Sequence, residues 1–191
     1  MSVTKAQAGA KIIEVASRFL GLYETKANAE WEGVDPLLAA DTAEMLRREL
    51  AASGWLPNWA YCAAFCEMVW RLAYTELGAP KALFDDILPK MTPGVMLTME
   101  NFRKRVVRAP APGAVAFWQK GISSRGHAGI VVRVHGDRKN MSCIEANTSA
   151  DSEASDERQR DGEGIYRKVR KLDFEQKPSL WLRGFLHPLE F

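Results

Sequence analysis

The spacing of apolar residues changes once along the chain, at the Pro-Ala-Pro-Gly sequence of residues 110–113. Before this break, apolar residues recur three and four positions apart, which predicts helices over residues 10–19, 37–50 and 61–77. After it, the apolar runs are short and separated by turn residues, which predicts strands at 114–118, 128–134, 141–147, 165–169 and 182–186. Helices followed by hairpin-linked strands are typical of the α+β class, with N-terminal helices packed on a C-terminal antiparallel sheet.

The segments between these elements are interpreted from their composition. Residues 23–32 are polar and rich in turn formers, so we expect a loop there. Residues 81–102 contain two prolines and predict one or two short helices. Residues 151–164 are charged and have no apolar periodicity, which predicts a surface loop. The length of 191 residues and the lack of an internal repeat predict a single domain over residues 1–191.

Charge and hydropathy argue against several classes of function. Lys and Arg number 26 against 24 Asp and Glu, and a net charge of +2 gives no bulk attraction to nucleic acid. No apolar run approaches the roughly 20 residues that cross a bilayer, and the first residues do not resemble a signal peptide. We therefore expect a monomer that is made in the cytoplasm, without a nucleic-acid partner and without insertion into a membrane.

The chain has three cysteines, Cys62, Cys66 and Cys143, which are too few and odd in number for a disulfide framework. Cys62 and Cys66 would share one face of a helix and, together with His127, offer three possible metal ligands. Structural zinc sites use two close pairs of ligands, and the sequence has no second pair. We therefore expect no metal and no cofactor.

Cys62 differs from the other two cysteines in its position. It falls in the first turn of a predicted helix, just after Pro57 and Asn58. Unpaired N–H groups and the positive end of the helix dipole favour a thiolate at such a position. Cys66 lies one turn further along, in the apolar stripe, and Cys143 lies in a strand, so both are interpreted as small buried apolar residues.

His127 is the histidine best placed to act as a base. It follows Gly126 at the start of a predicted strand, and its small neighbours allow a close approach of another segment or a substrate. His135 and His187 stand beside turn residues and are interpreted as surface or packing histidines.

The strand that follows carries an acid and an amide. In an extended strand Cys143, Glu145 and Asn147 point to one side, so Glu145 or Asn147 can hold the imidazole of His127 from a neighbouring strand. A cysteine, a histidine and a residue that orients the histidine are the parts that a thiol nucleophile needs.

The segments around these residues follow a recognisable pattern. Residues 59–65 read W-A-Y-C-A-A-F, residues 126–131 read G-H-A-G-I-V and residues 144–149 read I-E-A-N-T-S. They resemble the W-C-A-x-F, G-H-V-G-I-V and I-E-G-N-T-S segments of the CHAP family of cysteine, histidine-dependent amidohydrolases/peptidases, with two extra residues between Trp and Cys. Residues 112–117 are similar to its P-G-D strand, with Ala114 where an Asp is common. Weaker matches extend the resemblance over about residues 20–187.

The resemblance implies a papain-like fold of the CHAP/NlpC type and a peptidoglycan substrate. The family cleaves amide bonds either between sugar and stem peptide or within the peptide. By this resemblance Cys62 is the nucleophile, His127 the base, Glu145 the orienting residue and Asn147 a fourth site residue. The sequence has no Asp-rich calcium loop of the kind that some members carry.

Substrate contacts are expected from residues next to the nucleophile and from the N-terminal segment. Tyr61, Asn58 and Tyr23 are candidates for a second donor to the oxyanion, and Trp59 is a further candidate for substrate binding.

Two other classes of function stay open from the sequence. One is an acyl transferase that uses the same thiol chemistry, and the other is a non-catalytic wall-binding or virion structural protein. For a hydrolase, we expect action on the cell wall after release or delivery. A phage lysin and an antibacterial effector both fit, the latter with an immunity or delivery partner.

Overall fold

The computed structural model describes residues 2–26, 30–33, 36–150 and 162–191. The helices are α1 (Lys5–Ser17), α2 (Pro36–Ala52), α3 (Cys62–Glu76), α4 (Lys81–Ile87), the 3₁₀ helix η1 (Leu88–Lys90) and α5 (Val95–Asn101). The strands are β1 (Leu22–Lys26), β2 (Glu30–Gly33), β3 (Val106–Val107), β4 (Val115–Lys120), β5 (Gly126–Val134), β6 (Asn140–Thr148), β7 (Gly164–Lys171) and β8 (Leu180–Leu186).

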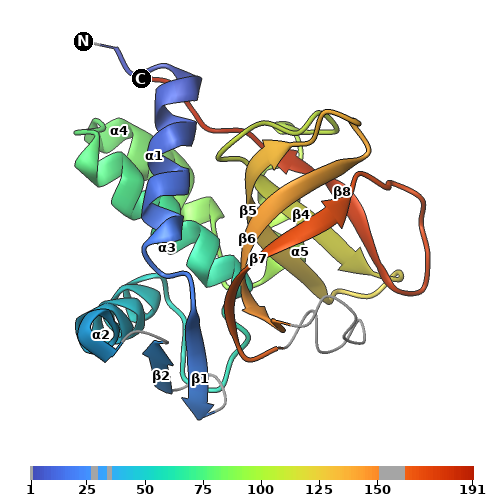
Figure 1. Cartoon of the computed structure of the whole chain (residues 1–191). Helices are drawn as coiled ribbons and strands as arrows, with labels where there is room; N and C mark the ends of the chain where they lie inside the picture. Colours follow the sequence, from blue (N-terminus) through green and yellow to red (C-terminus); the bar gives the residue numbers. More distant parts are fainter. Residues whose placement is uncertain (1, 27–29, 34–35, 151–161) are drawn as a thin grey trace.

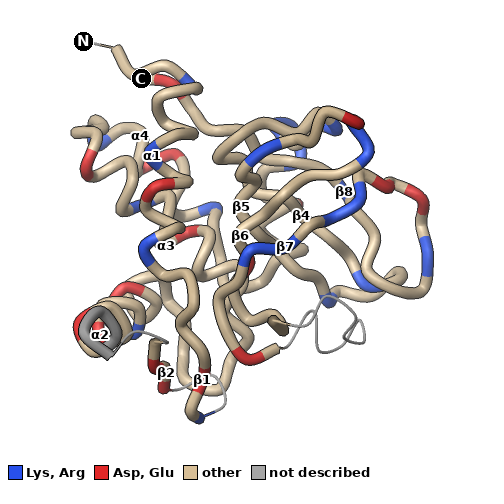
Figure 2. Tube along the Cα trace, viewed as in Figure 1, with Lys and Arg blue, Asp and Glu red and all other residues tan. Residues whose placement is uncertain are grey.

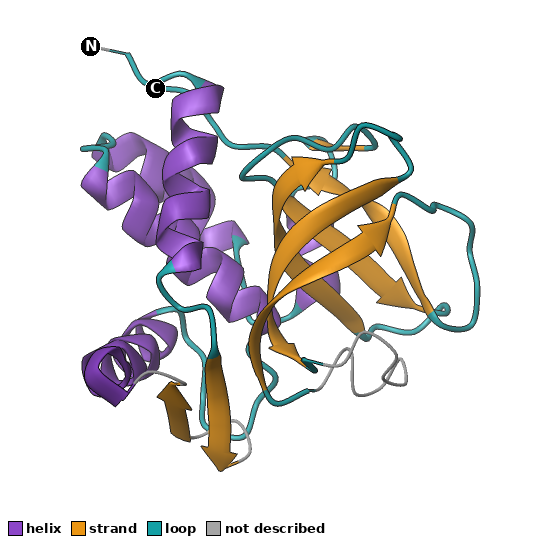
Figure 3. Cartoon of the chain, viewed as in Figure 1, coloured by secondary structure: helices purple, strands orange, loops and turns teal. Residues whose placement is uncertain are grey.

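The strands form one antiparallel sheet in the order β2-β1-β7-β6-β5-β4-β8-β3. Strands β4 to β8 curl around one another, and most of the helices gather on one side of them (Figures 1 and 3). The α+β class, with N-terminal helices packed on a C-terminal antiparallel sheet, is therefore confirmed. No helix in the described ranges has the length and apolar character needed to cross a membrane.

Helix α3 is the central helix of the fold. Every side chain from Cys62 to Trp70 is buried, because α3 lies between the sheet and the other helices. Its packing partners include α1, α2, β5 and β6. Burial on nearly all sides explains why the sequence of this helix is apolar almost all round. The position of its first residue is consequently fixed by the core.

Two apolar clusters stabilise the molecule. The larger one lies between the helices and the sheet and includes Phe65, Trp70 and Ile130. The smaller one lies among strands β4, β5, β6 and β8 and includes Trp118 and Cys143. Strands β4, β5, β6 and β8 contribute side chains to both clusters and are therefore buried on both faces. The strands that carry the predicted site residues therefore have little freedom to shift.

Helix α1 begins five residues earlier than the apolar spacing indicates. Thr4 caps it, because its hydroxyl accepts from the Gln7 N–H at 3.3 Å while the Gln7 side chain accepts from the Thr4 N–H at 2.9 Å. This capping box satisfies N–H groups that have no partner inside the helix. Its polar first turn is not visible to a search for apolar periodicity.

The prediction of a loop at residues 23–32 was wrong, because β1 and β2 form a hairpin there. β1 joins the sheet through the pairing of Tyr23 with Gly164 in β7. A side chain at Gly164 would place its Cβ 2.5 Å from the Leu22 carbonyl oxygen, so glycine permits this close approach. The polar hairpin is held by a distant segment, which its own composition does not reveal.

The other connecting segments gave mixed outcomes. The predicted short helices between residues 81 and 102 are present as α4, η1 and α5. The two-residue strand β3 was not predicted. Most of the predicted surface loop at 151–164 lies outside the described residues.

The two ends of the described chain pair with each other. The Val3 N–H donates to the Phe191 carbonyl at 2.6 Å, and the Phe191 N–H donates to the Val3 carbonyl at 3.1 Å. The Leu189 N–H also donates to the Tyr74 hydroxyl of α3 at 2.7 Å. Both ends therefore lie together beside the helices (Figure 1).

Candidate active site

Cys62 is the first residue of α3, one position after the predicted helix start at residue 61 and within the predicted first turn. No side chain caps this helix, so the N–H groups of its first turn stay available to an anion. Cys62 is buried, with 3% of the residue exposed. A thiolate at this position is stabilised by the positive end of the helix dipole.

Asn147 holds Tyr61, the residue that precedes the predicted nucleophile. Its Oδ1 accepts from the backbone N–H of Tyr61 at 2.9 Å, and both residues are buried. Asn147 has a φ of 58°, and the register of β6 against β7 shifts between Ala146 and Thr148. Asparagine is one of the few residues that adopt this conformation readily. The regular alternation predicted for this strand is therefore interrupted at Asn147, which turns to the start of α3.

Glu145 contacts the predicted base. Its Oε2 lies 2.9 Å from Nε2 of His127, and both side chains are 0% exposed. No described residue makes a hydrogen bond to Nδ1, the other ring nitrogen of His127. With Nε2 hydrogen-bonded to Glu145, Nδ1 is the nitrogen left to exchange a proton with a neighbouring thiol.

The charges around His127 favour its protonated form. Burial lowers the pKa of His127, but interactions with the side chains of Cys62 and Glu145 raise it to about 9. Cys62 and Glu145 are thus the two neighbours that act on the imidazole. A raised pKa of the imidazole is what a thiolate–imidazolium pair requires.

Arg170 in β7 binds the same glutamate and was missed in the sequence analysis. Its Nε donates to Oε1 of Glu145 at 2.8 Å, and its Nη2 donates to Oε2 at 2.5 Å. Burial raises the pKa of Glu145, but Arg170 and His127 lower it to about 2. Glu145 is therefore ionised in spite of its burial. Only the register of β6 against β7 would have revealed Arg170, and the sequence does not specify that register.

Trp118 forms an apolar wall beside these charges. Its ring centroid lies 5.9 Å from that of His127, and the guanidinium of Arg170 lies 5.7 Å from the Trp118 ring. Trp118 itself is 5% exposed. A buried indole excludes water from one side of the site, which strengthens the interactions among the charged groups.

Steric crowding explains why glycine occupies the two positions near His127, Gly126 and Gly129. A Cβ at Gly129 would lie 2.6 Å from Cγ of Glu145, and a Cβ at Gly126 would lie 2.6 Å from the Trp118 carbonyl oxygen. The strand that carries His127 can approach β4 and β6 this closely because both positions lack a side chain. The spacing G-H-A-G thus follows from the packing of the site.

The residues predicted to contact substrate lie in two parts of the fold, the turn before α3 and strand β1. Trp59 is 49% exposed and Asn58 is also exposed, both in the turn that leads into Cys62. Tyr23 lies in β1, where its hydroxyl donates to Glu32 at 3.3 Å.

The expectation for Tyr61 was wrong. This side chain is 0% exposed and its hydroxyl accepts from Nε1 of Trp31 at 3.1 Å, while its N–H is bound by Asn147. Because the hydroxyl is buried and the N–H is already bound, neither donor is offered to a substrate, and Tyr61 supports the core beneath the site.

The remaining cysteines and histidines lie outside this arrangement. Cys66 and Cys143 are buried free thiols, and burial raises the pKa of each well above its usual value. His135 bonds Ser142 at 2.8 Å, and His187 bonds the Ala109 carbonyl at 2.6 Å. Among the described residues, no group of three His, Cys, Asp or Glu side chains is arranged to hold a metal ion.

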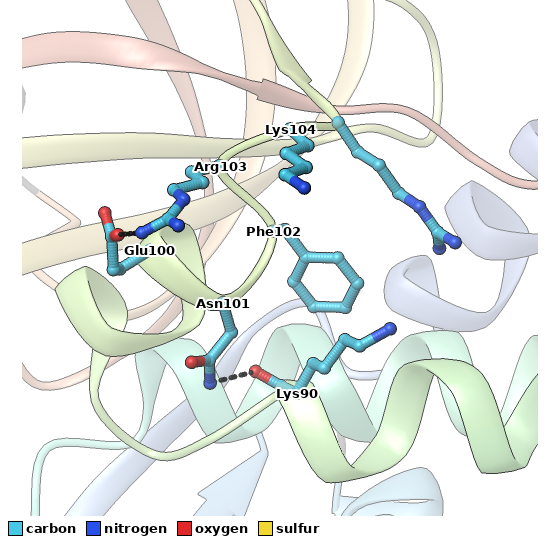
Figure 4. Close-up of a pocket in the computed structure, with 7 residues that line it drawn as sticks. Lys90, Glu100, Asn101, Phe102, Arg103 and Lys104 are labelled. Carbon is cyan, nitrogen blue, oxygen red and sulfur yellow. Dashed lines mark hydrogen bonds and ion pairs between the residues drawn. The ribbon is translucent and has the colours of Figure 1, made fainter.

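A cavity of about 460 Å³ lies elsewhere, against α5 and the segment that follows it (Figure 4). Four cations line it, but Arg103 pairs with Glu100, and Lys90 and Arg105 both pair with Asp86. None of the residues around Cys62 and His127 contributes to it. We assign no role to this cavity.

Comparison with known proteins gave one result. The family model described as CHAP domain matches residues 52–147, which is just over half of the chain. This segment runs from the end of α2 to Asn147 and includes Cys62, His127 and Glu145, but not Arg170. No curated protein and no solved structure matched the chain.

Proposed function

The chain belongs to the CHAP domain family, and on this basis we propose that it is a cysteine amidase or endopeptidase that cleaves amide bonds of bacterial peptidoglycan. The observation that carries the proposal is the buried contact of His127 with Glu145, and the side chains of Cys62 and Glu145 both raise the pKa of His127. A thiol, a base and a carboxylate in this order are the groups that catalyse acyl transfer. Peptidoglycan as the substrate follows from the family.

The proposed reaction begins with the thiolate of Cys62. Its sulfur attacks the carbonyl carbon of an amide, and the electron pair of the carbonyl moves to oxygen. The backbone N–H of Cys62, which lies at the start of α3, is the proposed donor to this oxyanion. The tetrahedral intermediate then expels the amine, which takes the proton held by Nδ1 of His127. This step leaves a thioester on Cys62.

Water completes the cycle. Neutral His127 accepts a proton from water as the oxygen attacks the thioester, and the carboxylic acid leaves as the thiolate is restored. Throughout, Glu145 keeps its bond to Nε2, so that the proton is exchanged at Nδ1. If an amine replaces water at this step, the same enzyme is an acyl transferase.

The substrate is proposed to contact the turn before α3. Trp59 is nearly half exposed three residues before the nucleophile, and indole rings stack well on the faces of sugars and planar peptide groups. Asn58 next to it offers an amide. We further propose action at the cell wall after release or delivery, as a phage lysin or as an effector with an immunity partner.

A digestion experiment tests the function. Purified peptidoglycan is incubated with the protein, and the soluble fragments are identified by mass spectrometry. We expect cleavage at an amide bond, and Cys62→Ala should reduce the rate by about a thousandfold or more because the nucleophile is lost. Cys66→Ala is the matched control in the same helix and should keep most of the activity, since Cys66 is buried and interpreted as a packing residue.

The fragments also decide among the alternatives. Free stem peptides indicate an amidase, cleaved peptides an endopeptidase, and products joined to an added amine a transferase. Binding to peptidoglycan without any covalent change would indicate the non-catalytic alternative. Equal activity of the Cys62→Ala variant and the unchanged protein would exclude the proposed thiol mechanism.

A further inference from the structure

Strand β7 carries four cations, Arg167, Lys168, Arg170 and Lys171, which appear as blue segments in Figure 2. They differ in their surroundings. The Lys168 ammonium donates to the Ser149 carbonyl at 2.8 Å, Arg167 and Lys171 are exposed, and Arg170 reaches Glu145. Arg170 is therefore the cation of this strand that contacts the buried site.

We infer that Arg170 is a positioning residue of the reaction, whose guanidinium fixes the Glu145 carboxylate and thereby the ring of His127. This inference rests on the proposed function, because it concerns the same thiol chemistry. Arg170 lies outside the segment matched by the family model. It does not touch the reacting atoms and acts through Glu145.

The geometry limits how Glu145 can move. Arg170 binds both carboxylate oxygens, and Oε2 also bonds Nε2 of His127. Rotation of the carboxylate would break both bonds to Arg170. Only a guanidinium presents two parallel N–H groups that match a carboxylate in this way. Glu145 therefore offers Oε2 to His127 in one fixed direction.

Arg170 is itself held in place. Its guanidinium lies over the Trp118 ring, and its side chain is 16% exposed. A cation that stacks on an indole and binds a carboxylate has little freedom to leave. Trp118 also contacts the ring of His127, so one side chain supports both partners of Glu145.

Among the described residues of the site, Arg170 supplies the positive charge that balances Glu145. In the reactive state Cys62 and Glu145 each carry one negative charge, and His127 and Arg170 each carry one positive charge. Among the described residues, the thiols of Cys66 and Cys143 also lie near this set, but burial raises the pKa of each well above the usual range, so both stay neutral. Removing Arg170 would leave one uncompensated negative charge in a buried site, which opposes ionisation of Cys62 and Glu145.

The test compares Arg170→Gln and Arg170→Lys with Arg167→Gln, the control from the exposed face of the same strand. Two quantities are followed across pH, namely kcat/KM on peptidoglycan fragments and the rate at which iodoacetamide alkylates Cys62, located by peptide mass spectrometry. Circular dichroism checks that each variant is folded. The alkylation rate needs no substrate and reports the ionisation of the thiol directly.

For Arg170→Gln we expect kcat to fall about tenfold with little change in KM, since the ring of His127 is no longer held in one direction. The acid limb of both pH curves should move up by about one pH unit, because a compensating charge is lost. Arg170→Lys should restore the position of the acid limb but not the full kcat, because an ammonium keeps the charge and cannot make both bonds. Arg167→Gln should match the unchanged protein.

The possible failures are distinguishable. Folded Arg170→Gln and Arg170→Lys variants with the kcat and the pH curves of the unchanged protein would overturn the role of Arg170. If Arg170→Gln does not fold, a full kcat in a folded Arg170→Lys variant would have the same meaning. An unchanged protein that does not act on peptidoglycan, together with a shifted alkylation curve in Arg170→Gln, would overturn the proposed substrate and leave the role of Arg170 standing.

Discussion

At the residue scale, Glu145 and Asn147 show how two residues of one strand, separated by a single position, can serve different parts of a site. A perfectly alternating strand would place both side chains on the same side. The φ of 58° at Asn147 breaks this alternation, so that Glu145 holds His127 and Asn147 holds the backbone of Tyr61. The two residues should therefore respond differently to substitution.

Glu145→Gln should reduce kcat by at least about tenfold, which corresponds to about 1.4 kcal/mol of transition-state stabilisation. An amide has one acceptor, so its NH₂ group must face N–H donors of Arg170 or of His127. The negative charge that stabilises the imidazolium is also lost. Steady-state rates on purified peptidoglycan measure the effect.

Asn147→Ala is the comparison within the same strand. It leaves the buried N–H of Tyr61 without its acceptor, which should cost about 1–3 kcal/mol in the free energy of unfolding. Its activity should fall less than that of Glu145→Gln, because the bond between His127 and Glu145 remains. A near-normal Glu145→Gln variant beside a strongly impaired Asn147→Ala variant would reverse the two assignments and indicate a Cys-His-Asn site.

At the element scale, β5 positions His127 by lying unusually close to its neighbours. Gly129 faces the side chain of Glu145 on β6, and Gly126 faces the backbone of β4. Close contact keeps His127 within reach of Glu145 from the adjacent strand. The separation of these strands therefore helps to set the geometry of the candidate site.

Gly129→Ala should lower activity by displacing Glu145 from His127. The new Cβ would lie 2.6 Å from Cγ of Glu145 and 3.1 Å from the Ile144 carbonyl oxygen, and overpacking of this kind costs about 1–3 kcal/mol of stability. Gly136→Ala, in the turn after the same strand, meets no atom within 4 Å and is the control. Thermal unfolding and kcat are measured for both. Full activity in a folded Gly129→Ala variant would contradict this account of the motif.

Elements with apolar periodicity were predictable from the sequence, and elements that depend on partners were not. Helices α2 and α3 and strands β4 to β8 follow from local spacing. The β1–β2 hairpin is polar and forms against β7, about 140 positions away in the chain, so no local pattern reveals it. Arg170 could not be predicted for the same reason, because its contact with Glu145 depends on the register between two strands.

At the scale of the whole molecule, the buried His127–Glu145 pair links folding to pH. The pKa of His127 is raised from 6.5 to about 9 in the folded protein, so its contribution is full below pH 6.5 and disappears as pH rises through 9. The pKa of Glu145 is lowered from 4.5 to about 2, so its contribution is full above pH 4.5 and disappears as pH falls through 2. Both contributions are present together between about pH 4.5 and 6.5.

We therefore expect the free energy of unfolding to decline between pH 6.5 and 9 more steeply in the unchanged protein than in His127→Gln. Urea denaturation at a series of pH values measures this slope. The variant lacks the group that releases a proton on unfolding in this range. Parallel curves for the two proteins would show that His127 does not carry the raised pKa.

The pairing of Val3 with Phe191 has a consequence for how the protein can be joined to a tether or to another domain. A tether or carrier domain joined at either end would leave the surface from the same spot, with the same reach. The ends are also close enough for a short peptide to connect them, which would turn the polypeptide into a circle. A circular permutant with its new ends at the turn around Gly136, where space is free, would keep the core packed in the same way.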